Sequence, residues 1–270
     1  MKIGIIGCGN MCECILAGLV SSKEYSPDSI YVFNRTAATV KRLCQQYGVQ
    51  PGKDALDVAK KSDIIMLGVK PYAVCSVVEM IRDAVTEDKI VLSIAAAITI
   101  ALIEKALVHR RKVVRVMPNV PVRVGAGATS VTPNTLMTPE DTELILKMFR
   151  TVGTAVQVEE SHIHAVVAVA GSAPAYVFMF MEAMGDAAVH EGLSRDKAYA
   201  FAAQTVMGAA KMLQEGGGVS PAQLKDMVCS PGGTTIEAVR ALEKGGMRSA
   251  VIEAMIACAD RSKELEAKLN

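Results

Sequence analysis

Glycine-rich and hydroxyl-rich turns are the parts of this sequence whose residue types and spacing could bind a charged ligand. The first turn reads Gly7-Cys8-Gly9-Asn10-Met11-Cys12, and it follows an apolar run at residues 2–6 and opens a helical pattern. In such a loop the first glycine allows a tight turn, the second lets the backbone approach a pyrophosphate, and the helix N-terminus supplies N–H donors. The third position of this fingerprint, usually Gly or Ala, is Cys12. The turn therefore predicts a dinucleotide site, with a plain strand-to-helix connection as the alternative.

The end of the second predicted strand favours a phosphorylated cofactor. It reads Phe33-Asn34-Arg35-Thr36 and contains no acidic residue. An NAD site places Asp or Glu here to accept a hydrogen bond from the ribose 2'-hydroxyl, whereas an arginine can pair with a 2'-phosphate. We therefore favour NADPH over NADH; the alternative is that Arg35 is a solvated residue in a turn.

Two further loops follow predicted strands, and they read Gly68-Val69-Lys70-Pro71 and Ile94-Ala95-Ala96-Ala97. Ligands of open α/β sheets bind outside the carboxyl ends of the strands, which is where both loops lie. The small residues at 95–97 would leave room for a ribose or nicotinamide ring, although alanines could equally be helix filler.

A hydroxyl-rich turn stands near the other end of the chain. A predicted helix is followed by Ser230-Pro231-Gly232-Gly233 and by a second helix that begins with Thr234 and Thr235. Backbone N–H groups and hydroxyls at a helix N-terminus can hold a carboxylate without a cationic side chain. Taken alone, the segment could equally be a helix hairpin with threonine caps.

The elements that must position these turns fall into two parts. From residue 2 to about residue 158, short β-branched runs alternate with amphipathic helical patterns, which predicts a doubly wound parallel sheet with helices on both faces. The predicted strands cover residues 2–6, 30–33, 64–69, 90–94, 113–117, 128–132 and 155–158. A helix between the last two begins at Thr138 with an N-cap and an N1 proline.

After Glu160 the strand patterns stop and one helical pattern follows another. Helix breaks are predicted at residues 192–194, 216–218, 230–233 and 245–246. We therefore predict an α/β fold with a Rossmann-type nucleotide domain over residues 1–160 and an all-α domain over residues 161–270.

The composition excludes several classes of partner. The 270 residues are 51% hydrophobic and carry a net charge of +1, which gives no general attraction to nucleic acid or to an anionic membrane. Seven unclustered cysteines and a start without a signal-peptide pattern favour the cytoplasm and predict no metal site. The uncharged run 161–181 is long enough to span a bilayer, but its His, Gly, Ser and Pro residues favour a buried helix of a soluble protein.

The segment 221–243 resembles the signature of the pyrroline-5-carboxylate reductase family. The likeness continues along the whole chain, in order, through Gly7-x-Gly9-x-Met11, Val69-Lys70-Pro71, Met117-Pro118-Asn119-x-Pro121, Gly171-Ser172-x-Pro174-Ala175-Tyr176 and Gly208-Ala209-Ala210. The resemblance implies an oxidoreductase that reduces the C=N bond of L-1-pyrroline-5-carboxylate to L-proline, the last step of proline biosynthesis. It implies hydride from NADPH, or from NADH, and a helical domain that interlocks two subunits, with a ring of dimers left open.

The resemblance also implies roles for individual residues. Thr234 and Thr235 with Gly232 and Gly233 would hold the substrate carboxylate, and the rest of that pocket would be shaped by Glu160, Gly171, Ser172 and Pro174. Our candidates for catalytic residues are Thr235 and Ser172, although no His, Cys or Tyr is placed as an obligatory acid. The implied cofactor residues are Ile6, Gly7, Cys8, Gly9, Asn10, Met11, Asn34, Arg35, Gly68, Val69, Lys70, Pro71, Ile94, Ala95 and Ala96.

Four positions depart from the family pattern. Ala170 and Ala173 stand where members commonly have serine and glycine, which leaves the wall of the substrate pocket less defined. Ala55 replaces an asparagine that often helps to hold the cofactor, and Met227 replaces a polar residue, so we carry over neither role.

Two other functions remain as alternatives. A β-hydroxyacid dehydrogenase also pairs a nucleotide domain with a helical domain, but it presents a catalytic lysine from the helix at the junction, and residues 171–192 contain no Lys, Arg or Asn. A non-catalytic dinucleotide sensor would need the first 158 residues but not the Ser-Pro-Gly-Gly-Thr-Thr turn.

Overall fold

The computed structural model describes residues 1–269, and these divide into two compact units. The first unit comprises Met1–Ser172 and the chain from Cys258 onward, and the second comprises Ala173–Ala257. The sequence placed a domain boundary near residue 160. The structure continues the first unit to Ser172 because the segment after Glu160 packs on the sheet, where Ile163 is fully buried and Ala168 is 2% exposed.

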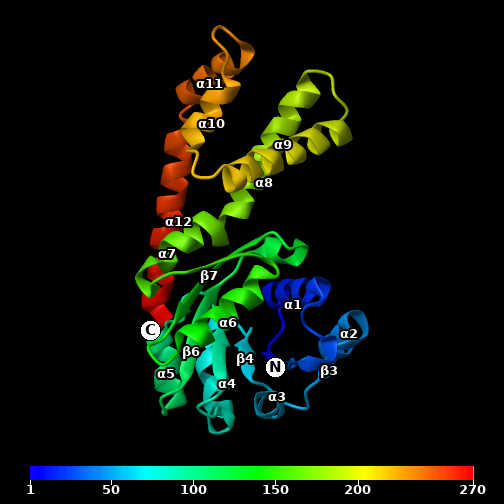
Figure 1. The fold of residues 1–270 in the computed structure, drawn as a ribbon, viewed down its shortest axis with the longest axis vertical. Coiled ribbons are helices and arrows are strands. Elements are labelled where there is room, and N and C mark those ends of the chain that lie inside the picture. The colour runs from blue at the N-terminus through cyan, green and yellow to red at the C-terminus, as the bar shows by residue number, and fades with distance from the viewer. Residues whose placement is uncertain (270) are drawn as a thin grey trace. The chain divides into compact units, whose positions relative to one another are not determined.

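The first unit contains an eight-stranded sheet with the order β3-β2-β1-β4-β5-β6-β7-β8 (Figure 1). The strands are β1 (Ile3–Ile6), β2 (Ile30–Phe33), β3 (Gln50–Pro51), β4 (Ile64–Leu67), β5 (Ile90–Ser93), β6 (Lys112–Met117), β7 (Gly127–Pro133) and β8 (Gly153–Gln157). The order reverses at β1, which pairs in parallel with both β2 and β4, so that Ile5 lies beside Val32 and Met66. All seven predicted strands are present, and their ends differ from the prediction by at most two residues.

Two features of the sheet differ from the sequence prediction. The strand β3 is too short to produce an alternating pattern, and it was not predicted. The strand β7 runs antiparallel to β6, whereas a parallel sheet was expected. Only residues 118–126 join β6 to β7, and such a link is too short for the crossover that a parallel neighbour would need.

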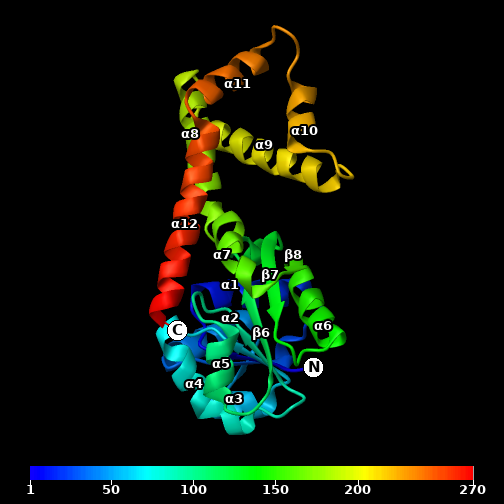
Figure 2. The ribbon, with the colours of Figure 1, turned by 90° about the vertical axis from the view of Figure 1, so that its left-hand side faces the viewer.

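Helices cover both faces of the sheet (Figures 1 and 2). One face packs against α1 (Asn10–Ser22), α2 (Ala37–Tyr47) and α6 (Pro139–Arg150), and the other packs against α3 (Ala55–Lys61), α4 (Val74–Ile81) and α5 (Ile100–Leu107). Side chains of the strands alternate between the faces: Ile5 joins the first core, and Ile6 joins the second. The strands therefore read as continuous apolar runs because both faces are buried.

The predicted start of α6 is confirmed in detail. Thr138 accepts a hydrogen bond from the backbone N–H of Asp141, and the Asp141 carboxylate accepts one from the backbone N–H of Thr138. This reciprocal capping box satisfies two donors that the helix leaves unpaired, and Pro139 occupies the first helical position, where no N–H is required.

The segment from Glu160 to Gly171 changes helix type twice. A short 3-10 turn (Glu160–His162) leads into α7 (Ile163–Val166) and then into a π-helical stretch (Val167–Gly171). The wider turn is closed by the Ser172 N–H, which donates to the Val167 carbonyl at 2.8 Å. Asn119, in the loop after β6, also holds this stretch, since its Nδ2 donates to the Ala170 carbonyl at 3.1 Å. Single π turns often occur at functional sites.

The second unit is built from helices alone. They are α8 (Ala173–His190), α9 (Arg195–Glu215), α10 (Pro221–Val228), α11 (Thr234–Lys244) and the first part of α12 (Met247–Leu269). The predicted helix breaks are all present. Between residues 173 and 257, the residues classed as buried are Gly185, Ala198 and Ala202, so this unit has scarcely any core of its own.

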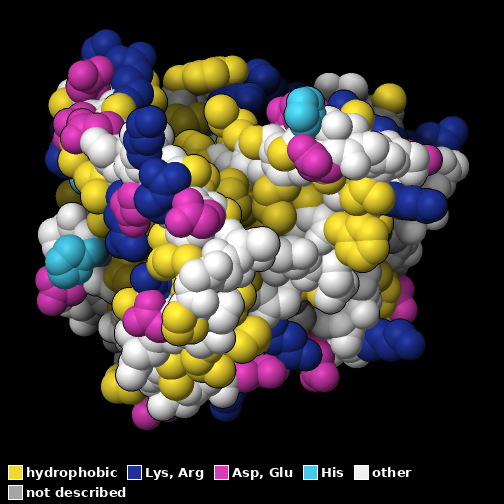
Figure 3. All heavy atoms as spheres, turned by 90° about the horizontal axis from the view of Figure 1, so that it is seen from above, with side chains coloured by type: hydrophobic (Ala, Val, Ile, Leu, Met, Phe, Trp, Pro, Cys, Tyr) yellow, Lys and Arg dark blue, Asp and Glu magenta, His cyan; other side chains and the backbone are white. Residues whose placement is uncertain are grey.

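The expectation that the apolar run 161–181 is buried holds for Ile163 and Ala168, but it is wrong for the later part of the run in a single chain. Phe178 is 64% exposed and Met179 is 69% exposed, although α8 packs extensively against α9. Hydrophobic side chains lie open among charged ones on the surface that Figure 3 shows. By length and composition, the continuous helix over Glu160–His190 could also cross a membrane.

Candidate active site

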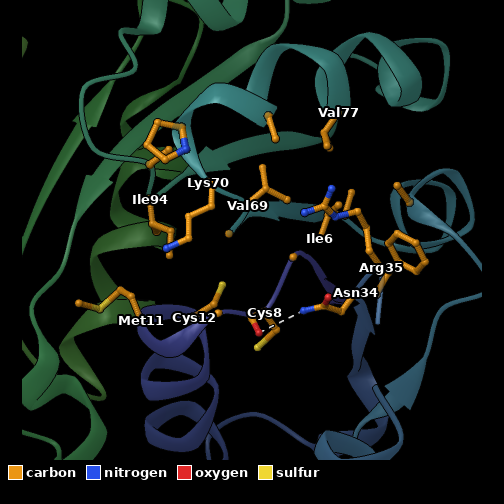
Figure 4. A pocket seen from close by; sticks show the side chains of 18 of the residues that line it. Ile6, Cys8, Met11, Cys12, Asn34, Arg35, Val69, Lys70, Val77 and Ile94 are labelled. Carbon is orange, nitrogen blue, oxygen red and sulfur yellow. Dashed lines mark hydrogen bonds between the residues drawn. The ribbon is translucent and has the colours of Figure 1, made fainter. Parts of the chain in front are cut away.

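A cavity of about 740 Å³ opens at the carboxyl ends of β1, β2, β4 and β5 (Figure 4). It lies where the strand order reverses between β1 and β4, which is the usual ligand site of a doubly wound sheet. All fifteen residues that were predicted to bind the cofactor line this one cavity. Four segments that are far apart in the sequence are thus brought together by the sheet.

The glycine-rich loop has the backbone that its sequence indicates. Gly7 has a φ of +81°, and a Cβ there would lie 2.9 Å from the backbone nitrogen of Val69, so the turn requires glycine. Gly9 is the N-cap of α1, and a Cβ there would meet nothing within 4 Å. The space beside Gly9 is therefore open to a ligand, next to the free N–H groups of the first helical turn.

Asn34 connects the end of β2 to the glycine-rich loop. Its Nδ2 donates to the Cys8 carbonyl at 3.2 Å, and its Oδ1 accepts from the Thr36 N–H at 3.2 Å. Arg35 follows it, is exposed, and has no hydrogen-bond or ion-pair partner within residues 1–269. Figure 4 shows Arg35 and Lys70 on two sides of the cavity, with Val69 between them. Both cations are thus available to an anionic ligand.

Cys12, the departure in the fingerprint, packs inside the site. A Cβ at Gly68 would lie 2.2 Å from the Cys12 sulfur, and that sulfur lies 3.7 Å from the Met66 sulfur. The hydrogen bond to Cys8, together with burial, raises the pKa of the Cys12 thiol well above its ordinary value. Cys12 is therefore a neutral packing residue here, and the close fit explains why position 68 is a glycine.

Eight residues that line the cavity were not among the predicted cofactor residues. They are Cys12, Phe33, Ala55, Tyr72, Ala73, Ser76, Val77 and Met80. Most come from α4 and from the 3-10 turn Pro71–Ala73 before it, so the signal that could have found them is the helical pattern that follows Gly68-Val69-Lys70-Pro71. Ala55, which was not assigned a role, lines the cavity as the buried first residue of α3.

The predicted substrate residues are divided between the two units. Glu160, Gly171 and Ser172 belong to the first unit, whereas Pro174, Gly232, Gly233, Thr234 and Thr235 belong to the second. None of the eight lines the cofactor cavity. Ser172 accepts a hydrogen bond from the Cys258 thiol at 3.3 Å, which leaves its own hydroxyl hydrogen available to another acceptor. Their roles in binding or catalysis remain predictions.

The start of α11 has the form that the sequence predicted. Gly233 is the N-cap, no side chain caps the helix, and Thr234 and Thr235 occupy its first two positions. Gly232 has a φ of +68°, which sets the turn that precedes the cap. Uncapped N–H groups and two hydroxyls at the start of an eleven-residue helix suit a carboxylate.

Comparison with known proteins covers almost the entire chain. Residues 160–265 match the family model "Pyrroline-5-carboxylate reductase dimerisation", and residues 2–97 match "NADP oxidoreductase coenzyme F420-dependent". The chain is 52% identical to the pyrroline-5-carboxylate reductase of Escherichia coli K12 over 98% of both chains. It is 42% identical to that of Methanosarcina acetivorans over 99% of this chain and 98% of the other.

Two solved structures share the fold over the same length. The pyrroline-5-carboxylate reductase of Coxiella burnetii has a TM-score of 0.90 at 38% identity, with 98% of both chains covered. The Plasmodium falciparum pyrroline carboxylate reductase, solved with NADP bound, has a TM-score of 0.88 at 27% identity, again with 98% of both chains covered.

Proposed function

The chain belongs to the pyrroline-5-carboxylate reductase family, and on that premise we propose how its residues carry out the reaction. It is an NAD(P)H-dependent oxidoreductase that reduces the C=N bond of L-1-pyrroline-5-carboxylate to L-proline. The observation that carries the proposal is the single cavity at the β1/β4 reversal, which gathers the glycine-rich loop, Arg35 and the loops after β4 and β5.

The residues of this cavity fit NADPH. Gly9 leaves open space beside the N-terminus of α1 for the pyrophosphate, and the unpartnered Arg35 would hold the 2'-phosphate. The small side chains of Ala95 and Ala96 leave room for the nicotinamide end. The chemistry that NADPH supplies when bound is hydride donation. NADH would lack the contact to Arg35 and remains the weaker alternative.

We assign the substrate carboxylate to the start of α11. Its uncapped N–H groups, with the hydroxyls of Thr234 and Thr235, offer donors without burying a cationic side chain. Gly171, Ser172 and Pro174 would shape the remainder of the pocket. We infer that the imine binds already protonated or takes its proton from water. The protein would then accelerate the reaction by orienting the imine and the cofactor toward each other.

Substitution of Ser172 or Thr235 by alanine tests this mechanism. The expected result is a raised KM for the imine with less than about a hundredfold loss of kcat. A loss of kcat larger than that with an unchanged KM would identify the substituted residue as a catalytic acid. Unchanged values of both would remove the residue from the site.

The exposed apolar surface of the second unit supports a homodimer. Residues 160–265 match a dimerisation family, and the exposed side chains Phe178, Met179 and Phe201 would be covered by the same helices of a second copy. A dimer gives the apolar helix at 160–190 a protein neighbour, which supports a cytoplasmic enzyme. A solution mass of twice the chain is expected; a multiple of that mass would indicate a ring of dimers, and a monomer would refute the proposal.

The alternative functions are separated by substrate. Purified protein is mixed with NADPH and racemic pyrroline-5-carboxylate, and separately with NADP⁺ and a set of 3-hydroxy acids. We expect oxidation of NADPH in the first mixture and no reduction of NADP⁺ in the second. Reduction of NADP⁺ in the second would indicate a hydroxyacid dehydrogenase, and NADPH binding without turnover in either would indicate a sensor.

A further inference from the structure

The loop between β5 and α5 contains a strained residue beside the cofactor cavity. Ala97 has a φ of +63°, in the left-handed region that alanine seldom adopts, and it is 7% exposed. The three residues before it, Ile94, Ala95 and Ala96, line the cavity. Strain of this kind persists only where neighbouring contacts enforce it, and it is found preferentially at functional sites.

A side chain from a distant part of the chain, Glu160, holds the backbone three residues beyond Ala97. Its Oε1 accepts a hydrogen bond from the backbone N–H of Ile100, the first residue of α5, at 2.9 Å. Thr99 caps the same helix by accepting from the Leu102 N–H. The loop is thus fixed at one end by β5 and at the other by the Glu160 carboxylate, with Ala97 between them.

Glu160 is itself held by a buried arginine. The same Oε1 accepts from Arg115 Nη1 at 2.9 Å, and the Arg115 side chain is 3% exposed. Arg115 extends from β6 and also donates to Glu266 of α12 at 2.8 Å. A guanidinium that bridges two carboxylates has a fixed orientation, so the position of the Glu160 oxygen is fixed too.

The last turns of α12 extend this arrangement. Cys258, Ser262 and Glu266 are spaced four residues apart and therefore lie on one face of the helix. They contact Ser172, His164 and Arg115 respectively, with 3.0 Å between Ser262 Oγ and His164 Nδ1. The C-terminal helix thus supports Glu160 and the segment that follows it.

We propose that Glu160 is a positioning residue for the cofactor: held by Arg115, it holds the start of α5 and so keeps the left-handed turn at Ala97, and the cavity wall Ile94–Ala96, in the binding conformation. This differs from the role in shaping the substrate pocket that the family resemblance implies for Glu160. It rests on the proposed function, because the cavity is assigned to NADPH.

The proposal predicts that relief of the strain compensates for loss of the contact. Glu160→Ala should raise the Kd for NADPH about tenfold, and Glu160→Gln, which keeps an oxygen acceptor, no more than about threefold. Glycine adopts the left-handed conformation readily, so Ala97→Gly alone should stay within about twofold of wild type. In the Glu160→Ala background, Ala97→Gly should recover about fivefold in affinity.

Lys23→Gly is the matched control, because it places glycine at another residue with positive φ, +62°, at the C-terminal end of α1 and outside the cavity. NADPH binding is measured by fluorescence titration of the full-length protein, with a melting temperature for each variant to establish folding. If Glu160→Ala does not fold, the same comparison is made in the Glu160→Gln background, where recovery should be complete.

Three results would overturn the proposal: no recovery with Ala97→Gly, equal recovery with Lys23→Gly, or an unchanged NADPH Kd with a raised KM for the imine. The last result would return Glu160 to the substrate pocket. Absence of NADPH binding by the wild-type protein would instead overturn the proposed function, so the two failures are distinguishable.

Discussion

Replacement of each glycine of the nucleotide loop by alanine should have a different effect. Gly9→Ala should weaken NADPH binding and leave the fold intact, whereas Gly7→Ala should destabilise the fold. Gly9 has φ −87° and ψ −174°, which alanine adopts freely, and its Cβ would meet no atom within 4 Å. Gly7 has φ +81°, and its Cβ would lie 2.4 Å from Val69 Cγ1 and 2.9 Å from the Val69 backbone nitrogen. The first methyl group would enter only the space assigned to the pyrophosphate, whereas the second would enter the fold itself.

The magnitudes follow from these contacts. Gly9→Ala should raise the free energy of unfolding by less than about 1 kcal/mol, because alanine reduces the conformational freedom of the unfolded chain. It should weaken NADPH binding at least tenfold, or about 1.4 kcal/mol, since the methyl group overfills the phosphate site. Gly7→Ala should cost about 1–2 kcal/mol for the left-handed backbone and about as much again for the clash with backbone, which lowers Tm by roughly 5–15 °C.

The assay is a pair of measurements on each variant: thermal unfolding without ligand, and NADPH titration followed by fluorescence. Gly9→Ala should retain the wild-type Tm and lose affinity, and Gly7→Ala should lose Tm. If Gly9→Ala binds NADPH as tightly as wild type, the pyrophosphate does not lie at the start of α1 and the assignment of the cavity is refuted.

Three further predictions concern single side chains. Arg35→Ala should lower kcat/KM with NADPH about tenfold and leave it unchanged with NADH, because an exposed charge-assisted hydrogen bond to the 2'-phosphate is lost. Val108 is 66% exposed with φ +66°, so Val108→Gly should raise stability by about 1 kcal/mol, measured as an increase in Tm. The hydrogen bond from Arg42 holds the pKa of Glu13 below its ordinary value. This hydrogen bond therefore stabilises the fold at a pH above the pKa that Glu13 has in the unfolded chain. That contribution should be lost as the pH falls through the lowered pKa, and Arg42→Ala should raise the pKa of Glu13 in a carboxyl NMR titration.

Each of these has a contrary outcome. An equal loss with both cofactors would place Arg35 away from the 2'-phosphate, and a lower Tm for Val108→Gly would mean that its side chain packs more than its exposure indicates. A stability difference between wild type and Arg42→Ala that persists at acid pH would show that the arginine acts through packing and not through Glu13.

The sheet and the nucleotide cavity were predictable because each rests on a local pattern. Buried runs such as Ile64–Leu67 produce a strong strand signal, and the glycine spacing at Gly7 and Gly9 follows from backbone geometry alone. The carboxyl ends of neighbouring parallel strands meet at one edge of a sheet, so the residue pattern indicated that the loops after β1, β2, β4 and β5 lie close together, and the family resemblance supplied the individual cofactor residues.

The features that were not predicted depend on contacts between distant parts of the chain. No local pattern indicates that Glu266 returns to Arg115, or that Glu160 accepts a hydrogen bond from the start of α5. The exposure of Phe178 was missed for a related reason: an apolar helix has the same sequence whether its own chain or a second copy covers it. The antiparallel β7 could have been found from the short link 118–126.

The central claim is that this chain transfers a hydride from NADPH to an imino acid. NADPH that carries deuterium at the transferring position of the nicotinamide is incubated with the protein and racemic pyrroline-5-carboxylate, and the product is analysed by mass spectrometry and chiral chromatography. We predict L-proline with one deuterium on the ring carbon of the former C=N bond. Unlabelled or racemic proline, or oxidation of NADPH without proline, would contradict the account.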